Sequence, residues 1–256
     1  MEGSVFTVLN GKKILVMGVA NQKSIAWGCA QAITAAGGEV IYTYQNDRIK
    51  TSLQKFLPAS ALLVECDVSD DAAIEQTFAT IQAQVGKLDG IVHAIAYANR
   101  EELDGTVYTA SRAGYLLAQE ISAYSLIAVA KFGRALLNPN GSIVTMTYFG
   151  SERAVPNYNV MGIAKASLEA SVRYLARDLG PDQIRVNAIS AGAIKTLAVT
   201  GVKGYRDLLM ESENRTVDGQ SVTIEEVGNV ASFLLSPLAS GMTGDVIYVD
   251  KGVHLQ

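Results

Sequence analysis

Tyr158 and Lys165 lie seven residues apart in a stretch with a helical pattern. Because an α-helix advances ~100° per residue, seven steps come within about 20° of two full turns, so both side chains should share one helix face. A phenol can donate a proton, and an ammonium group can hold a sugar hydroxyl. An exposed surface pair has the same spacing. The pair therefore predicts chemistry only if the rest of the chain supplies a cleft.

The residues around this pair indicate the elements that position it. An apolar strand expected at residues 142–147 leads into the stretch, and the helix expected from Tyr158 runs to about Leu179. Other short apolar runs are typical of strands buried on both faces of a parallel sheet. They are expected at residues 14–17, 39–44, 61–66, 89–96, 184–189 and 246–249. Helical patterns separate them, including a long one at 112–137. The sequence thus predicts an α/β fold: one domain, 1–256, with a doubly wound, mostly parallel, Rossmann-like sheet of seven strands.

Composition excludes several classes of protein. Of the 256 residues, 49% are hydrophobic and 18% are charged, which suits a well-buried core. The net charge of -4 argues against nucleic-acid binding. Cys29 and Cys66 have no metal-site spacing, and we expect buried, reduced thiols in a cytoplasmic protein with no metal. No signal-peptide pattern is present, and the most apolar run, 121–130, is too short to span a bilayer, so we expect no membrane insertion.

Small residues follow the first expected strand, at the edge where such sheets bind ligands. Gly18 and Ala20 lead to a helix that begins near Ser24 and Ile25. Small residues let backbone N–H groups approach a pyrophosphate, and a helix N-terminus favours its negative charge. A tight turn without a ligand explains this segment equally well.

Polar residues follow the second and third expected strands. Gln45 stands where many dinucleotide-binding folds place an acid on the adenosine ribose, and a neutral amide suits ribose hydroxyls. Arg48 could reach a 2′-phosphate, but a solvated helix face explains it more simply, which favours NADH over NADPH. Asp67 and Val68 could contact adenine, or Asp67 could cap a helix. His93 is expected to be a hydrogen-bonded core histidine.

Together these residues resemble the short-chain dehydrogenase/reductase superfamily and, within it, the enoyl-acyl carrier protein reductases of the FabI type. The likeness covers nearly the whole chain. Most members of the superfamily use Tyr-x3-Lys, which would require a tyrosine where this chain has Met161. The enoyl reductases use Tyr-x6-Lys with a second tyrosine ten residues earlier, which matches Tyr148, Tyr158 and Lys165. Other matching stretches are 18–20, 24–26, 44–47, 66–68, 93–96, 103–105, 165–170, 185–192, 196–198 and 243–244.

The resemblance implies reduction, by NADH, of the trans-2 double bond of enoyl thioesters on acyl carrier protein, the last reductive step of fatty acid elongation. Tyr148, Tyr158 and Lys165 are the implied catalytic residues. The implied cofactor-binding residues are Gly18, Ala20, Ser24, Ile25, Gln45, Asp67, Val68, Ala94, Ile95, Ala96, Lys165, Ile194 and Thr196. The implied substrate-binding residues are Tyr97, Ala98, Leu103, Tyr148, Tyr158, Met161 and Ala198.

The resemblance also implies a homotetramer, a substrate lid at about 193–216, and a basic surface at Lys203 and Arg206 that faces the acidic carrier protein. Two alternatives stay open at this point. One is a carbonyl reductase on the same fold, such as a 3-oxoacyl reductase, against which Met161 counts. The other is a regulator that binds a dinucleotide without turnover, since a fold does not determine function.

Overall fold

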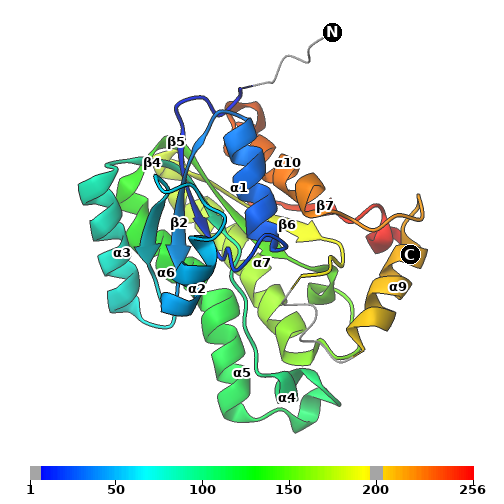
Figure 1. Ribbon diagram of the computed structural model, residues 1–256. Coiled ribbons are helices and arrows are strands. Elements are labelled where there is room, and N and C mark those ends of the chain that lie inside the picture. The colour runs from blue at the N-terminus through cyan, green and yellow to red at the C-terminus, as the bar shows by residue number, and fades with distance from the viewer. Residues whose placement is uncertain (1–6, 197–203) are drawn as a thin grey trace.

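The computed structural model describes residues 7–196 and 204–256, and within them the chain forms one parallel sheet of seven strands (Figure 1). The order across the sheet is β3-β2-β1-β4-β5-β6-β7. This confirms the predicted fold class. The strands are β1 (Lys13–Met17), β2 (Glu39–Tyr44), β3 (Leu62–Glu65), β4 (Leu88–His93), β5 (Leu137–Thr147), β6 (Arg185–Ala191) and β7 (Val246–Val249).

Helices cover both faces of the sheet, as the doubly wound pattern requires. One face carries α1 (Ile25–Ala35), α2 (Asp47–Leu53) and α10 (Ile224–Leu235). The other carries α3 (Asp71–Gln84), α6 (Ser125–Gly133) and α7 (Asn159–Leu179). Each face has its own apolar cluster against the sheet. α5 (Arg112–Gln119) and the short α4 (Arg100–Leu103) extend beyond one edge of the sheet, and α9 (Tyr205–Arg215) lies to one side (Figure 1).

Two glycines let α1 and α10 pack backbone to backbone. A Cβ on Gly28 would lie 2.2 Å from the carbonyl oxygen of Ile224, and one on Gly228 would lie 2.3 Å from that of Gly28. Any larger residue would force the helices apart. This close contact fixes α10 against α1.

Two element boundaries differ from the sequence expectation. β4 ends at His93, so residues 94–96 form a loop and not a strand. The last residue of the neighbouring β1, Met17, pairs with His93. Residues 94–96 therefore extend past the end of that strand. β5 begins at Leu137, earlier than the expected residue 142. The long helix predicted at 112–137 is confirmed, because a π-helical turn at Glu120–Tyr124 joins α5 to α6. With a mean hydropathy of 1.2, the segment 112–136 is long and apolar enough to span a membrane. Half of its apolar window is buried within the molecule, as in a core helix.

The strand order changes direction at β1: β2 and β3 are added on one side of it, and β4 is added on the other. β1 pairs with both β2 and β4, and β2 and β3 lie to one side of it while β4 to β7 lie to the other. In open α/β sheets, ligands bind at such a switch point, outside the carboxyl ends of the strands. The loops that follow β1 and β4 therefore meet where the sequence predicts the cofactor.

Candidate active site

Lys165 lies on the face of α7 that packs against β5. Its side chain is 5% exposed, and Nζ donates a hydrogen bond of 2.7 Å to the carbonyl oxygen of Met146 near the end of β5. Burial lowers the pKa of Lys165 to about 8, and the nearby carboxylate of Glu169 opposes that shift. An ammonium group has three donors. Lys165 is therefore a fixed cation with donors left for a ligand.

Tyr158 is the N-cap residue of α7, one residue before the helix begins. Its ring meets that of Tyr148 edge to face, with centroids 5.1 Å apart and planes at 74°. Gly150 makes room for this contact, since a Cβ there would lie 2.7 Å from the Tyr158 ring. Burial raises the pKa of Tyr148 to about 12 and raises that of Tyr158 as well. Both phenols are thus protonated hydrogen-bond donors at neutral pH.

Gly18 forms the centre of the predicted phosphate cradle. It has a φ of +96°, and a Cβ there would lie 2.1 Å from the carbonyl oxygen of Ala94. The loops after β1 and β4 thus touch backbone to backbone, as the switch-point geometry requires. Ser24 caps α1, since its Oγ accepts from Trp27 N at 3.3 Å. Small residues beside a helix N-terminus fit a dinucleotide pyrophosphate.

The polar residues after β2 and β3 also meet. Gln45 Nε2 donates to Asp67 Oδ2 at 3.3 Å, and Asp67 Oδ1 accepts from both the backbone and hydroxyl of Ser69. Amide and carboxylate groups at this position fit ribose hydroxyls and adenine. Val68 is 8% exposed and belongs to the core cluster beneath them.

Other predicted cofactor residues lie around the same edge. Ile194 and Thr196 are each 8% exposed just past the end of β6, and Thr196 N donates to the Ile194 carbonyl at 2.7 Å. Ala94 and Ile95 pack on opposite faces of the sheet, in the two core clusters. The remaining predicted cofactor residues lie in the same loops and at the start of α1: Ala20, Ile25 and Ala96.

Most of the predicted substrate residues form one small apolar cluster beside Tyr158. It contains Leu103 and Met161, with Ala98 and Tyr205 of α9 packed against it. The ring of Tyr97 is outside this cluster and is 51% exposed. Residues 197–203, which include Ala198 and Lys203, lie outside the described residues, as does the middle of the predicted lid.

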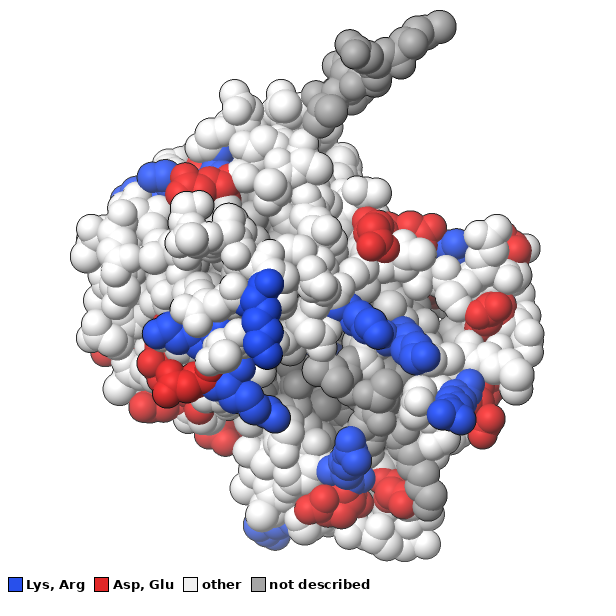
Figure 2. Space-filling view, viewed as in Figure 1, with Lys and Arg blue, Asp and Glu red and all other residues white. Residues whose placement is uncertain are grey.

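Basic side chains surround this region. Figure 2 shows several Lys and Arg side chains on the face that carries the carboxyl ends of the strands. Arg206 lies in the first turn of α9 and is exposed, as is Lys195 after β6. Phosphates and an acidic partner would both meet positive charge here.

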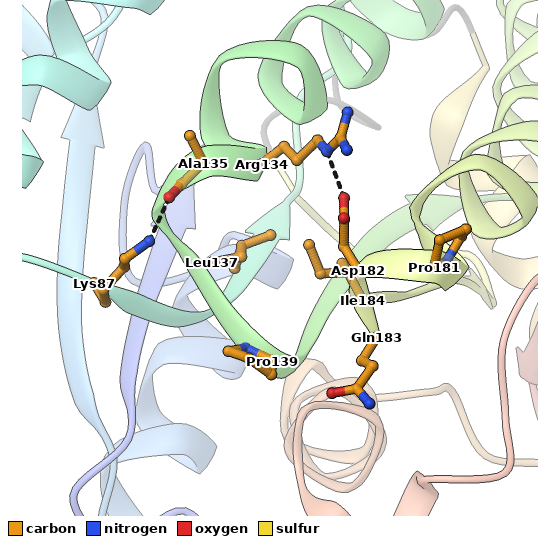
Figure 3. Close-up of a pocket in the computed structure, with 9 residues that line it drawn as sticks. All are labelled: Lys87, Arg134, Ala135, Leu137, Pro139, Pro181, Asp182, Gln183 and Ile184. Carbon is orange, nitrogen blue, oxygen red and sulfur yellow. Dashed lines mark hydrogen bonds and ion pairs between the residues drawn. The ribbon is translucent and has the colours of Figure 1, made fainter.

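A hollow lies at the opposite edge of the sheet (Figure 3). Its two basic side chains already have partners within the protein. Arg134 forms an ion pair with Asp182, and Lys87 donates to the carbonyl of Ala135 at 2.6 Å. It adjoins the amino ends of β4 to β6 and contains none of the predicted site residues. The candidate active site is therefore the edge that carries Tyr158 and Lys165.

Comparison with known proteins agrees with this geometry. A sequence model of a family described as enoyl-(acyl carrier protein) reductase matches residues 18–254. The enoyl-acyl carrier protein reductase (NADH) FabI of Enterococcus faecalis is 62% identical over 247 residues, 96% of this chain and 99% of that protein. The FabI of Bacillus subtilis is 48% identical, covering 96% of this chain and 97% of its own. This chain belongs to that family.

Solved structures of enoyl reductases share the whole fold. A Bacillus cereus enoyl-acyl carrier protein reductase, crystallised with NADP+ and an indole naphthyridinone, has a TM-score of 0.93 and 48% identity over 97% of this chain and 98% of its own. An Anaplasma phagocytophilum reductase in complex with NAD also has a TM-score of 0.93, with 41% identity over 97% of this chain and 96% of its own. Both relatives hold dinucleotides on this architecture.

The structure adds residues to the site that were not predicted from the sequence. Asn159 Nδ2 donates to the carbonyls of Leu103 and Gly105, at 3.0 and 3.1 Å, and so ties the substrate side to α7. Glu169 is 7% exposed and accepts a hydrogen bond from Thr147. A charged residue within the apolar stripe of α7, four positions after Lys165, was the sequence signal for Glu169.

Proposed function

We propose that this protein reduces the trans-2 double bond of enoyl thioesters carried on acyl carrier protein, with NADH, in fatty acid elongation. The observation that carries the proposal is the pair of half-buried tyrosines, Tyr148 and Tyr158, with the buried Lys165 at the carboxyl edge of the sheet. The chain is also 62% identical to an enoyl reductase over nearly its full length. A carbonyl reductase of this superfamily would need a tyrosine at the position of Met161.

Tyr158 acts on the charge that the reaction creates. When bound, NADH would supply a hydride to the β-carbon of the enoyl thioester, which would place negative charge on the thioester oxygen as an enolate. Protonation at the α-carbon would then complete the reduction. The Tyr158 hydroxyl, kept protonated by burial, donates to the thioester oxygen. A donor of this kind accelerates the reaction because the oxygen carries more charge in the transition state than in the ground state. Tyr148 lines the acyl pocket against the Tyr158 ring.

Lys165 has a positioning role in this proposal. Its ammonium is held by the Met146 carbonyl and would hold the nicotinamide ribose hydroxyls, fixing the ring above the substrate. The small residues around Gly18 and the N-terminus of α1 would receive the pyrophosphate, and Gln45 with Asp67 the adenosine. The NADH named for the curated relatives supports NADH over NADPH.

Exposed apolar residues on neighbouring helices support a homotetramer. Leu116 on α5 is 57% exposed, Ile127 on α6 39%, and Tyr174 on α7 68%. Such side chains along helices of one face are typical of a surface buried between subunits. We expect sedimentation at micromolar concentration to give four chains per particle in a cytoplasmic protein, and a monomer would contradict the proposal.

The proposal is tested by following oxidation of NADH, and of NADPH, with crotonyl thioester and with an acetoacetyl thioester control. We expect turnover with NADH and the enoyl substrate alone. Turnover with only the ketone would identify a carbonyl reductase. Tight NADH binding without turnover of either substrate would favour the non-catalytic regulator.

Tyr158→Phe tests the role of the phenol. The variant keeps the ring against Tyr148 and loses the hydrogen-bond donor. We expect kcat to fall by about 10²–10³, the usual loss for one such donor, with NADH binding unchanged. Near-normal turnover would remove Tyr158 from the mechanism.

A further inference from the structure

Glu169 is a buried carboxylate in the wall of the active site. It lies on α7, four residues after Lys165, and is 7% exposed. Residues four apart on a helix are neighbours on one face, so Glu169 and Lys165 both point towards β5. Leu168 and Val172, which flank Glu169 on α7, are fully buried apolar residues. A carboxylate in such surroundings is retained only where a partner compensates for its lost hydration.

The partners of Glu169 and Lys165 are consecutive residues of β5. Thr147 Oγ1 donates to Glu169 Oε1 at 2.6 Å, and Lys165 Nζ donates to the carbonyl of Met146 at 2.7 Å. Thr147 is 4% exposed and immediately precedes Tyr148. The two charged side chains of α7 therefore hold the end of the strand that carries a catalytic tyrosine.

The other ionisable groups around the pair cannot replace this carboxylate. The two ring nitrogens of His93 on β4 form hydrogen bonds with the hydroxyl groups of Thr145 and Ser125. Burial lowers the pKa of His93 to about 3, so its ring is neutral. Burial also raises the pKa values of Tyr158 and, on β7, of Tyr248, so these phenols are neutral.

More distant charges are engaged elsewhere. Asp250 accepts from His254, and Glu152 accepts from Tyr248. Glu169 is the carboxylate that opposes the effect of burial on the pKa of Lys165. The charge state of Lys165 thus depends on one carboxylate, that of Glu169.

We propose that Glu169 is a positioning residue for the reaction: its carboxylate keeps the Lys165 ammonium charged and, through Thr147, fixes the β5 end beside Tyr148. The inference rests on the proposed function, since it assigns Lys165 to the nicotinamide ribose. Removing the negative charge leaves burial unopposed, so Lys165 loses its proton at a lower pH. A neutral Lys165 loses its charge-assisted hydrogen bonds to the ribose.

Glu169→Gln removes the charge but keeps the shape and an oxygen that accepts from Thr147. We expect NADH binding by this variant, followed by fluorescence from pH 6 to 9, to weaken from a lower pH than in the wild-type protein. From a wild-type pKa of about 8, a shift of one pH unit corresponds to about fivefold weaker binding at pH 8, approaching tenfold at higher pH, with little change at pH 6. The kcat/KM profile with crotonyl thioester should shift in the same direction.

Two further variants separate charge from hydrogen bonding. Thr147→Val keeps the carboxylate and removes its donor, so we expect lower kcat with a smaller pH shift than in Glu169→Gln. Asp178→Asn neutralises an exposed acid on the same helix and should match the wild-type profile. If Glu169→Gln does not fold, Glu169→Asp, which keeps the charge one methylene farther back, should retain the wild-type pH profile at reduced kcat.

Superimposable NADH-binding profiles for Glu169→Gln and wild type would overturn the inference. So would a Glu169→Asp profile shifted to lower pH despite its charge. The binding titration needs no turnover. A wild-type protein that binds NADH but reduces no substrate would therefore contradict the proposed function while still testing Glu169.

Discussion

Helices α7 and α9 both border the site, and they are held in opposite ways. α7 has ten buried residues among its 21, and its polar side chains Lys165 and Glu169 are bonded to β5. α9 has 11 residues and none of them is buried. It begins at Gly204 in a left-handed conformation, without a side-chain cap.

The contacts of α9 are concentrated at its two ends. Tyr205 packs on the substrate cluster. Arg215 donates to the carbonyls of Val253 and Gln256, and its guanidinium lies 5.6 Å from the ring centroid of Phe149. Few buried contacts make an element easy to displace. Lys165 and Glu169 thus lie on a helix that is fixed along its length, whereas α9, which falls within the predicted substrate lid, is held at its ends.

Truncating the core of α7 should have the largest effect. Leu168 is fully buried between Lys165 and Glu169 in the helix face. Leu168→Ala should lower the free energy of unfolding by about 2–5 kcal/mol, through lost apolar burial and the cavity left behind. Urea unfolding followed by circular dichroism measures this. A loss below 1 kcal/mol would mean that α7 is not the rigid partner in the comparison.

Raising the pH through the pKa of Lys165 should have the next largest effect. The pKa of Lys165 is lowered to about 8 by burial, so the charged form predominates below pH 8 and is lost as the pH rises through it. We expect kcat/KM for NADH to fall above pH 8, up to about tenfold per pH unit. A flat profile to pH 10 would show that the ammonium is not required.

Releasing the end of α9 should have a smaller and different effect. Arg215→Gln removes the charge over Phe149 and weakens the bonds to the C-terminal segment. We expect the KM for the acyl carrier protein substrate to rise about 2–5-fold, on the order of 0.5–1 kcal/mol, with kcat nearly unchanged. Arg177→Gln, at an exposed position of α7, is the control. An equal loss of kcat would mean that α9 positions the catalytic groups too.

Changing the middle of α9 should have the smallest effect. Met210 is 61% exposed, midway between Tyr205 and Arg215. Met210→Ser should alter the free energy of unfolding by no more than about 0.5 kcal/mol. Thermal unfolding checks this in the same assay as Leu168→Ala. A large destabilisation would identify Met210 as buried by a partner subunit and would sharpen the proposal of a homotetramer.

The sequence predicted the fold well because its signals are local. Apolar runs of four to eight residues and the helical patterns between them require no knowledge of tertiary contacts. The errors came at boundaries. β4 stops at His93 because the apolar residues beyond it, Ala94 and Ile95, pack as a loop against the two cores. β5 begins at Leu137, five residues before the expected start of its apolar run.

The candidate site divides in the same way. The spacing of Tyr158 and Lys165 predicted one helix face for both side chains. In the structure α7 begins at Asn159, with Tyr158 as its N-cap residue, and Lys165 is buried against β5. The sequence signal for a phosphate site at Gly18 was weaker, because a small residue in a turn is found both in ordinary loops and in ligand-binding loops. The structure adds one observation: the contact with the backbone of Ala94 excludes any side chain at Gly18.

Sequence alone thus determined the order of the elements and the parallel sheet, because both depend on periodicities of a few residues. Tertiary structure decided what surrounds them. Thr147 reaches Glu169 across 22 residues, and Arg215 reaches Gln256 across 41. Such contacts depend on how a strand, a helix and the C-terminal segment pack together. The same packing removes water from Lys165 and so lowers its pKa, which no local pattern in the chain encodes.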